Sequence, residues 1–237
     1  MDIWLFSLLM FAGCAACFGA ARLADRRIGL GAALAAALYV ALDDLATGLP
    51  SLLPALAVPG ADWNWSGKLL SLAVAAAVIA ALRLPRARVG LVAPTHVRTG
   101  LVALALFAAW GTGLGLLFRP GEAGAETLAF QASMPGLAEE LAYRGIVPAL
   151  LLGAAMADTA RRTPWAVVVA TALAFGLWHG LRVDGGAIGF DAMSALFPAL
   201  GSLAGGWLRF RTRSLVFPVL AHGIANVAFH LAGAAVA

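Results

Sequence analysis

The sequence predicts an all-α polytopic membrane protein, a transmembrane bundle of about eight helices. Of the 237 residues, 62% are hydrophobic and only 12% are charged, whereas soluble globular domains carry about 25% charged residues. The mean hydropathy is +0.91, which places the chain outside that soluble class. The net charge of +4 comes from single arginines and short clusters between apolar runs, so we expect a lipid bilayer and no nucleic acid as a partner.

Eight apolar runs are long enough, with allowance for tilt and kinks, to cross the roughly 30 Å hydrocarbon core of a bilayer. They cover residues 3–21, 29–46, 68–82, 101–118, 127–156, 164–181, 190–208 and 214–236. The first run has no basic segment before it and no clear cleavage site, so we expect an anchor helix and not a removed signal peptide. The sequence shows no internal repeat, and we predict one membrane domain with four helices in residues 1–118 and four in residues 127–237.

The loops after the first, third, fifth and seventh runs hold most of the 16 Lys and Arg residues, as the positive-inside rule expects of cytoplasmic loops. These loop residues are Arg22, Arg26, Arg27, Arg83, Arg86, Arg88, Arg98, Arg161, Arg162, Arg209, Arg211 and Arg213. Eight spans with both termini outside fit this pattern. The alanine- and arginine-rich composition favours a bacterial source, so the expected location is the bacterial inner membrane.

Three features of the N-terminal half have ordinary explanations. Cys14 and Cys17 share a helical face, and free cysteines are usually small buried packing residues. Asp43 and Asp44 close the second run, where an acidic helix end near water is expected. The proline-rich connection 47–67 carries two tryptophans and suits a loop in the interfacial aromatic belt, with a substrate-gating role as the alternative.

The fifth run carries three charged residues, Glu139, Glu140 and Arg144, that would lie at membrane depth. Each such charge costs at least about 2.5 kcal/mol, so all three must be paired, hydrated or used in chemistry. Glu140 and Arg144 are i, i+4 and share a helical face, whereas Glu139 points about 100° away. The spacing therefore predicts a neutralising Glu140–Arg144 pair and leaves Glu139 free to act as a base.

Prolines flank these charges. Ser133 and Pro135 resemble an N-cap followed by a first-turn proline, and Pro148 lacks the N–H that would bond to the carbonyl of Arg144. The sequence thus predicts a helix that starts or kinks at Pro135. A disturbed backbone at membrane depth usually lines a cavity, where polar groups can hold water.

Two later runs bring further polar groups, His179 in the sixth and His222 with Asn226 in the eighth. Singly, each is as readily a polar contact between helices as a catalytic group. Together with two intramembrane glutamates they favour a catalytic cluster. His230 continues the face of the eighth run towards its outer end, where an interfacial role is expected, and His96 lies in a basic loop.

Three motifs on successive apolar runs resemble those of a known protease family. They are Glu139-Glu140-x-x-x-Arg144, Phe175-x-x-x-His179 and His222-x-x-x-Asn226. In their order, spacing and placement on helices they resemble the CAAX-protease and bacteriocin-processing (CPBP) family of intramembrane endopeptidases, which includes type II CAAX prenyl proteases. The resemblance covers about residues 134–230, and the first four runs match by hydropathy only.

The resemblance implies a glutamate-dependent mechanism in a catalytic core at residues 127–237. Glu139 would be the general base that activates water, and His179 would help to hold this water. His222 with Asn226 would stabilise the oxyanion.

The remaining motif residues would support the site. Glu140 and Arg144 would be the structural pair, in agreement with their spacing. Phe175 would pack behind the histidine one turn later or line the substrate channel.

No cofactor is needed for the glutamate mechanism, but a zinc-dependent mechanism is the alternative. Glu139, His179 and His222 could bind Zn²⁺ with one open position. The sequence has no HExxH-like pair, and asparagine is a poor zinc ligand. We therefore favour the metal-free mechanism.

These observations favour an intramembrane endopeptidase that cuts a membrane-associated protein or peptide, lipidated or C-terminally anchored chains being candidates. Two other classes stay open. A membrane scaffold or immunity-type protein would keep the polar cluster for contacts between helices, and a proton-coupled transporter would also place Glu, His and Arg in the membrane. The complete set of motifs argues against the first, and their confinement to the C-terminal half argues against the second.

Overall fold

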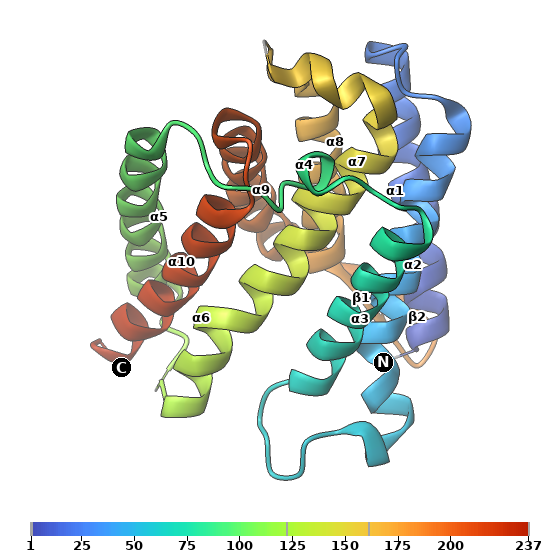
Figure 1. Cartoon of the computed structure of the whole chain (residues 1–237). Coiled ribbons are helices and arrows are strands. Elements are labelled where there is room, and N and C mark those ends of the chain that lie inside the picture. Colours follow the sequence, from blue (N-terminus) through green and yellow to red (C-terminus); the bar gives the residue numbers. More distant parts are fainter. Residues whose placement is uncertain (1, 122, 161, 237) are drawn as a thin grey trace.

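Helices form at each of the eight apolar runs in the computed structural model, which describes residues 2–121, 123–160 and 162–236 (Figure 1). The long helices are α1 (Ile3–Ala24), α2 (Leu30–Leu52), α3 (Trp65–Ala81), α5 (Val97–Phe118), α6 (Ala125–Glu140), α8 (Trp165–Gly180), α9 (Ala192–Thr212) and α10 (Val216–Ala234). The short elements are η1 (Pro54–Leu56), α4 (Arg86–Val89), η2 (Leu141–Ile146), α7 (Val147–Leu152), η3 (Gly153–Ala160), β1 (Leu181–Asp184) and β2 (Ala187–Phe190). The chain is a polytopic helical membrane protein.

Within the described residues, five helices are long and apolar enough to span a membrane, which is fewer than the eight predicted. They are α1, α2, α5, α10 and the continuous helix Ala125–Ala157. α3 and α8 contain 17 and 16 residues, which is only about 25 Å of helix against a hydrocarbon core of about 30 Å. α9 is long enough, but it contains Pro198 and carries Arg209 and Arg211 in its last turn.

The all-α prediction misses a small hairpin between α8 and α9. Strands β1 and β2 pair antiparallel, with Leu181 opposite Phe190. Gly185 and Gly186 form the turn with φ of +54° and +81°, and two positive φ values suit a tight hairpin turn. Helix α9 therefore starts at Ala192, two residues after the predicted start of the seventh run, and Phe190 belongs to β2.

The predicted helix start at Pro135 is wrong, because α6 runs through this proline. The Ser133 hydroxyl donates to the carbonyl of Ala129, 2.7 Å away, so Ser133 is an interior residue and not an N-cap. The backbone changes instead in η2, a π-helical turn directly after the glutamates and before Pro148. Such π-bulges are frequent at functional sites, and this one lies where the missing proline N–H predicted a disturbed helix.

α6 lies between two groups of helices (Figure 1): α3 flanks one side and α10 the other. Glycines allow the close approach of α6 and α10. A Cβ on Gly223 would lie 2.5 Å from the carbonyl oxygen of Ala132, and a Cβ on Gly136 would lie 2.8 Å from that of Val219. α5 packs on α10, α9 packs on α8, and α1 and α2 pack on each other.

Asp43 and Asp44 were predicted to lie at a helix end near water. This prediction is wrong, because α2 continues to Leu52. Asp44 is only 7% exposed and accepts hydrogen bonds from the Ser7 hydroxyl at 2.6 Å and from the Trp178 indole at 2.8 Å. Both aspartates therefore belong to polar contacts inside the bundle. Cys14 is buried in the core and, like Cys17, forms no disulfide in the described part of the chain, as expected of packing residues.

The connection between α2 and α3 is shorter than the predicted loop 47–67 and is fixed to the start of α6. The indole of Trp65 donates to Glu126 at 3.0 Å. Trp63 stacks on Phe130 with ring centroids 5.1 Å apart. These contacts hold the loop against the bundle; its interfacial placement and the gating alternative stay predictions.

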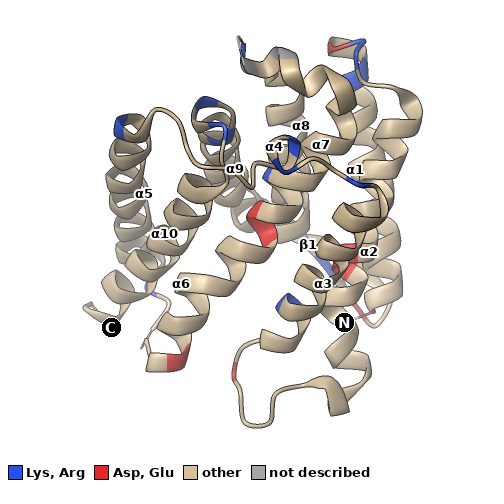
Figure 2. Ribbon diagram, in the orientation of Figure 1, with Lys and Arg blue, Asp and Glu red and all other residues tan. Residues whose placement is uncertain are grey.

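Lys and Arg gather at the end of the bundle opposite to the two chain ends (Figures 1 and 2). The predicted grouping of basic loops at one end is thus seen in the fold, although Arg161 lies outside the described residues. Which end faces the cytoplasm stays a prediction.

Candidate active site

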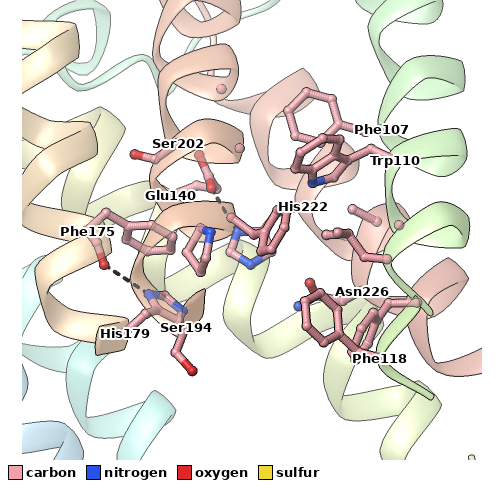
Figure 3. A pocket seen from close by; sticks show the side chains of 18 of the residues that line it. Phe107, Trp110, Phe118, Glu140, Phe175, His179, Ser194, Ser202, His222 and Asn226 are labelled. Atoms are coloured by element: carbon pink, nitrogen blue, oxygen red, sulfur yellow. Dashed lines mark hydrogen bonds and ion pairs between the residues drawn. The ribbon is translucent and has the colours of Figure 1, made fainter. Parts of the chain in front are cut away.

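A cavity of about 580 Å³ lies between α5, α8, α9 and α10. An aromatic wall is formed by Phe107, Trp110 and Phe118 (Figure 3), and Phe197 and Phe229 also line the cavity. Polar and ionisable residues line the same cavity: Glu140, Arg144, His179, Arg182, Asp191, Ser194, Ser202, His222 and Asn226. The cavity therefore combines an apolar surface with ionisable groups, as ligand and substrate sites commonly do.

Glu140 forms the centre of the buried charge network. Its Oε1 lies 3.1 Å from a guanidinium nitrogen of Arg144 and 2.8 Å from Nδ1 of His222. The Glu140 and Arg144 side chains are each only 3% exposed, so bulk water does not solvate either charge and each depends on the other for stabilisation. The Glu140–Arg144 ion pair predicted from the i, i+4 spacing is confirmed. His222 contacts the same Glu140 oxygen and extends the pair to a network of three residues.

α9 and α8 enclose this pair. A Cβ on Gly205 would lie 3.6 Å from the Arg144 guanidinium, so the glycine leaves room for a large planar group beside the helix. On the α8 side, the guanidinium lies 4.6 Å from the centroid of Phe175. An arginine over an aromatic face gains electrostatic stabilisation when it is desolvated.

Glu139 lies on the other face of α6, towards α3. Its Oε1 accepts a hydrogen bond from the Lys68 ammonium at 2.7 Å. Its Oε2 has no hydrogen-bond partner among the described residues and lies 3.8 Å from Nε2 of His222. The prediction that Glu139 is an unpaired acid is therefore wrong, because a lysine from the N-terminal half pairs with it; only its second oxygen is open.

Glu139 does not line the cavity, whereas Glu140 does. His222 connects the two carboxylates, since its Nδ1 contacts Glu140 and its Nε2 faces Glu139. The imidazole also lines the cavity. The two predicted glutamates thus meet at one histidine.

His179 lies near the end of α8 and lines the same cavity. Its Nδ1 lies 3.0 Å from the carbonyl oxygen of Phe175 (Figure 3), so this nitrogen is the donor and Nε2 is left as the acceptor of the neutral ring. Phe175 packs against the imidazole with ring centroids 4.4 Å apart and lines the cavity, in keeping with both positions predicted for it.

Asn226 lies one turn beyond His222 on α10. Its side-chain amide donates to Oε1 of Gln131 on α6 at 2.8 Å, which fixes its orientation. His230 is farther along the helix, with its ring 6.0 Å from that of Trp63, and does not line the cavity.

Sequence reasoning missed Lys68 and Gln131. Lys68 stands at the start of the third apolar run, and Gln131 lies two turns before Glu139 on α6. A polar residue inside an apolar run was the available signal for both.

The zinc alternative does not fit this arrangement. Among the described residues, no group of three or more His, Cys, Asp or Glu side chains could hold a metal ion. Glu139 is engaged by Lys68, and Nδ1 of His222 by Glu140. Glu139, His179 and His222 thus do not form a three-ligand zinc site here.

Comparison with known proteins identifies the C-terminal part of the chain. Residues 124–228 match the family described as type II CAAX prenyl endopeptidase Rce1-like. No curated protein sequence and no solved structure matched the chain. The matched segment begins at the start of α6 and ends in α10, so it contains every motif residue described above. Residues 124–228 are therefore similar to the Rce1-like domain of the type II CAAX prenyl endopeptidases, within the CAAX-protease and bacteriocin-processing family.

Proposed function

We propose that this protein is an intramembrane endopeptidase that hydrolyses a peptide bond of a membrane-associated protein or peptide. One observation carries the proposal: two neighbouring carboxylates meet at His222, on the edge of an aromatic-walled cavity, in a domain of an endopeptidase family. Structural contacts between helices do not require this combination of acid, imidazole and open cavity.

In the proposed reaction, Glu139 is the general base. Its Oε2 takes a proton from a water molecule, and the hydroxide oxygen attacks the carbonyl carbon of the scissile bond. Glu139 reaches the cavity through His222, whose Nε2 lies 3.8 Å from that oxygen. The 3.8 Å separation is too long for a direct hydrogen bond, so both groups stay available to a water. His179 accepts a hydrogen bond from the same water through its free Nε2.

Asn226 donates a hydrogen bond to the oxyanion that forms when the carbonyl is attacked, and His222 donates one through Nε2 when both of its ring nitrogens carry a proton, since its Nδ1–H is bound by Glu140. Both line the cavity from α10, and Gln131 holds the Asn226 amide. Donors fixed in advance are effective because they need no reorganisation during the reaction. Collapse of the intermediate breaks the C–N bond, and the proton held by Glu139 passes to the leaving amine. Glu140 and Arg144 keep His222 in place.

The cavity indicates the class of substrate. Its aromatic wall offers an apolar surface inside the membrane bundle, which suits a substrate that carries a lipid group or a C-terminal membrane anchor. We propose the bacterial inner membrane as the location, since the composition favours it.

The experiment compares the membrane proteomes of cells that carry the wild-type chain or Glu139→Gln, scored for shifted C-termini. Proteins whose C-termini are shortened only with the wild-type chain are the expected result, and they identify the substrate. Identical C-termini in both cell lines would contradict the peptidase proposal. A phenotype shared by both lines would then favour a scaffold, and solute uptake in proteoliposomes that is lost in Glu139→Gln would favour a transporter.

A further inference from the structure

The ammonium of Lys68 lies outside the family-matched segment but inside the site. It is in the first turn of α3, is 7% exposed, and lies 2.7 Å from Glu139 Oε1. The ammonium also lies 5.3 Å from the centroid of the Trp178 ring. In the described part of the chain, no other Lys or Arg forms an ion pair with Glu139. A buried lysine needs such partners, because an uncompensated charge in this environment costs several kcal/mol.

The nearby aspartates are within electrostatic range of this ammonium, but among the described residues neither forms an ion pair with it. Asp43 accepts the Ser71 hydroxyl at 2.6 Å, and Asp44 accepts the Ser7 hydroxyl and the Trp178 indole. Each aspartate thus has neutral donors of its own. Lys68 therefore pairs with Glu139, and the two aspartates act on its ammonium only at longer range.

Removing Lys68 would change the charge around Glu139. The other ionisable groups in electrostatic range of Glu139 come from α2, η2, α8 and α10: Asp43, Tyr143, His179 and His222. Arg144 is engaged by Glu140 on the opposite face. Without Lys68, the Glu139 carboxylate would face a neighbouring aspartate at membrane depth with no ammonium beside it, and a neutral carboxylic acid cannot act as a base.

We infer that Lys68 is a positioning residue of the active site, supplied by the N-terminal helices, which keeps Glu139 ionised and fixes one of its oxygens so that the other faces His222. This inference rests on the proposed role of Glu139 as the base. The inference assigns a function to the N-terminal half beyond its helical packing. The matched segment carries the motifs, and α3 carries the cation that keeps the Glu139 carboxylate ionised.

The test uses dicyclohexylcarbodiimide, an apolar reagent that adds to protonated carboxylic acids and leaves a stable acylurea. The full-length protein is purified in detergent as wild type, Lys68→Met, Lys68→Gln, Lys68→Arg and Ser71→Ala, and Glu139 modification is followed by peptide mass spectrometry over a pH series. In the wild type, a Glu139–Lys68 cross-link is counted as modified Glu139. Ser71→Ala is the matched control, since Ser71 is one turn farther along α3 and contacts Asp43.

At neutral pH we expect Glu139 to be modified about tenfold faster in Lys68→Met and Lys68→Gln, because the protonated fraction of Glu139 should be about ten times larger in these variants. Lys68→Arg and Ser71→Ala should follow the wild type, because both keep a cation beside Glu139. Wild-type rates in both uncharged variants would overturn the inference, and Lys68→Gln decides it if Lys68→Met does not fold. Unchanged C-termini in Glu139→Gln cells would contradict the peptidase proposal separately.

Discussion

The two neighbouring glutamates of α6 contact different halves of the protein. Glu140 faces the C-terminal helices and is held by Arg144 and His222 at 3% exposure. Glu139 faces the N-terminal helices, is 12% exposed, and keeps one oxygen without a partner. A step of about 100° around the helix therefore separates a carboxylate fixed in an ion pair from one with an oxygen open to reaction. Position around the helix, and not residue type, therefore determines which glutamate is fully paired and which keeps an open oxygen.

Glu139→Gln should cause the largest loss of activity. An amide cannot accept a proton from water, so we expect cleavage to fall about 10²- to 10⁴-fold, the usual contribution of a general base. The measurement is kcat on a substrate identified from the shifted C-termini. Unfolding in mixed micelles with a rising SDS fraction should show a smaller loss of stability than in Glu140→Gln, because the Lys68 ammonium keeps Asp43 and Asp44 within electrostatic range. A folded Glu139→Gln variant with normal turnover would contradict the role of Glu139 as the general base.

Glu140→Gln should instead mainly lower the stability of the protein. It leaves the Arg144 guanidinium buried without its carboxylate, which costs about 3–5 kcal/mol, and the same unfolding assay measures this loss. The double variant Glu140→Gln/Arg144→Met is the control, because it removes the unpaired charge and should recover part of the stability. If Glu140→Gln unfolds like the wild type but loses all turnover, Glu140 is the better candidate for the base, in agreement with its place in the cavity wall.

Local spacing explains which parts of this comparison could be predicted from the sequence. The Glu140–Arg144 pair follows from two residues four apart on one helix, and the structure has them in contact. Lys68 and Gln131 could not be assigned, because their partners are 71 and 95 residues away. Runs that are apolar all around do not reveal which helices will be neighbours.

The fold shows the same limit. Hydropathy located a helix at every apolar run, but it overestimated the number of spans because it does not fix where each helix ends. Pro135 was predicted to start or kink a helix, and the start is wrong because a proline is tolerated within a membrane helix when neighbouring groups satisfy the backbone. The hairpin had a local signal, the Gly185-Gly186 pair between two short runs, which helix-length windows do not register.

Gly223→Ala should disturb the contact on which both glutamates depend. The new methyl group would lie 2.5 Å from the backbone oxygen of Ala132, so α10 has to move away from α6. We expect a loss of about 1–3 kcal/mol, as for other overpacked sites, with lower turnover because His222 moves with α10. Gly113→Ala on α5 is the matched control, since nothing lies within 4 Å of its added methyl group, and it should be neutral or slightly stabilising.

Gln131→Leu should have the smallest effect, because it touches neither glutamate. It removes the acceptor that holds the Asn226 amide at 2.8 Å, so the amide loses its fixed orientation while Asn226 stays in the cavity. We expect kcat to fall about tenfold with KM unchanged, which corresponds to ~1.4 kcal/mol in the transition state. Asn226→Ala, which removes the donor itself, should lose about 10²- to 10³-fold. Equal losses in the two variants would show that the Gln131 contact matters as much as the donor. An unchanged kcat in both would remove Asn226 from the oxyanion site and leave His222 as its donor from α10.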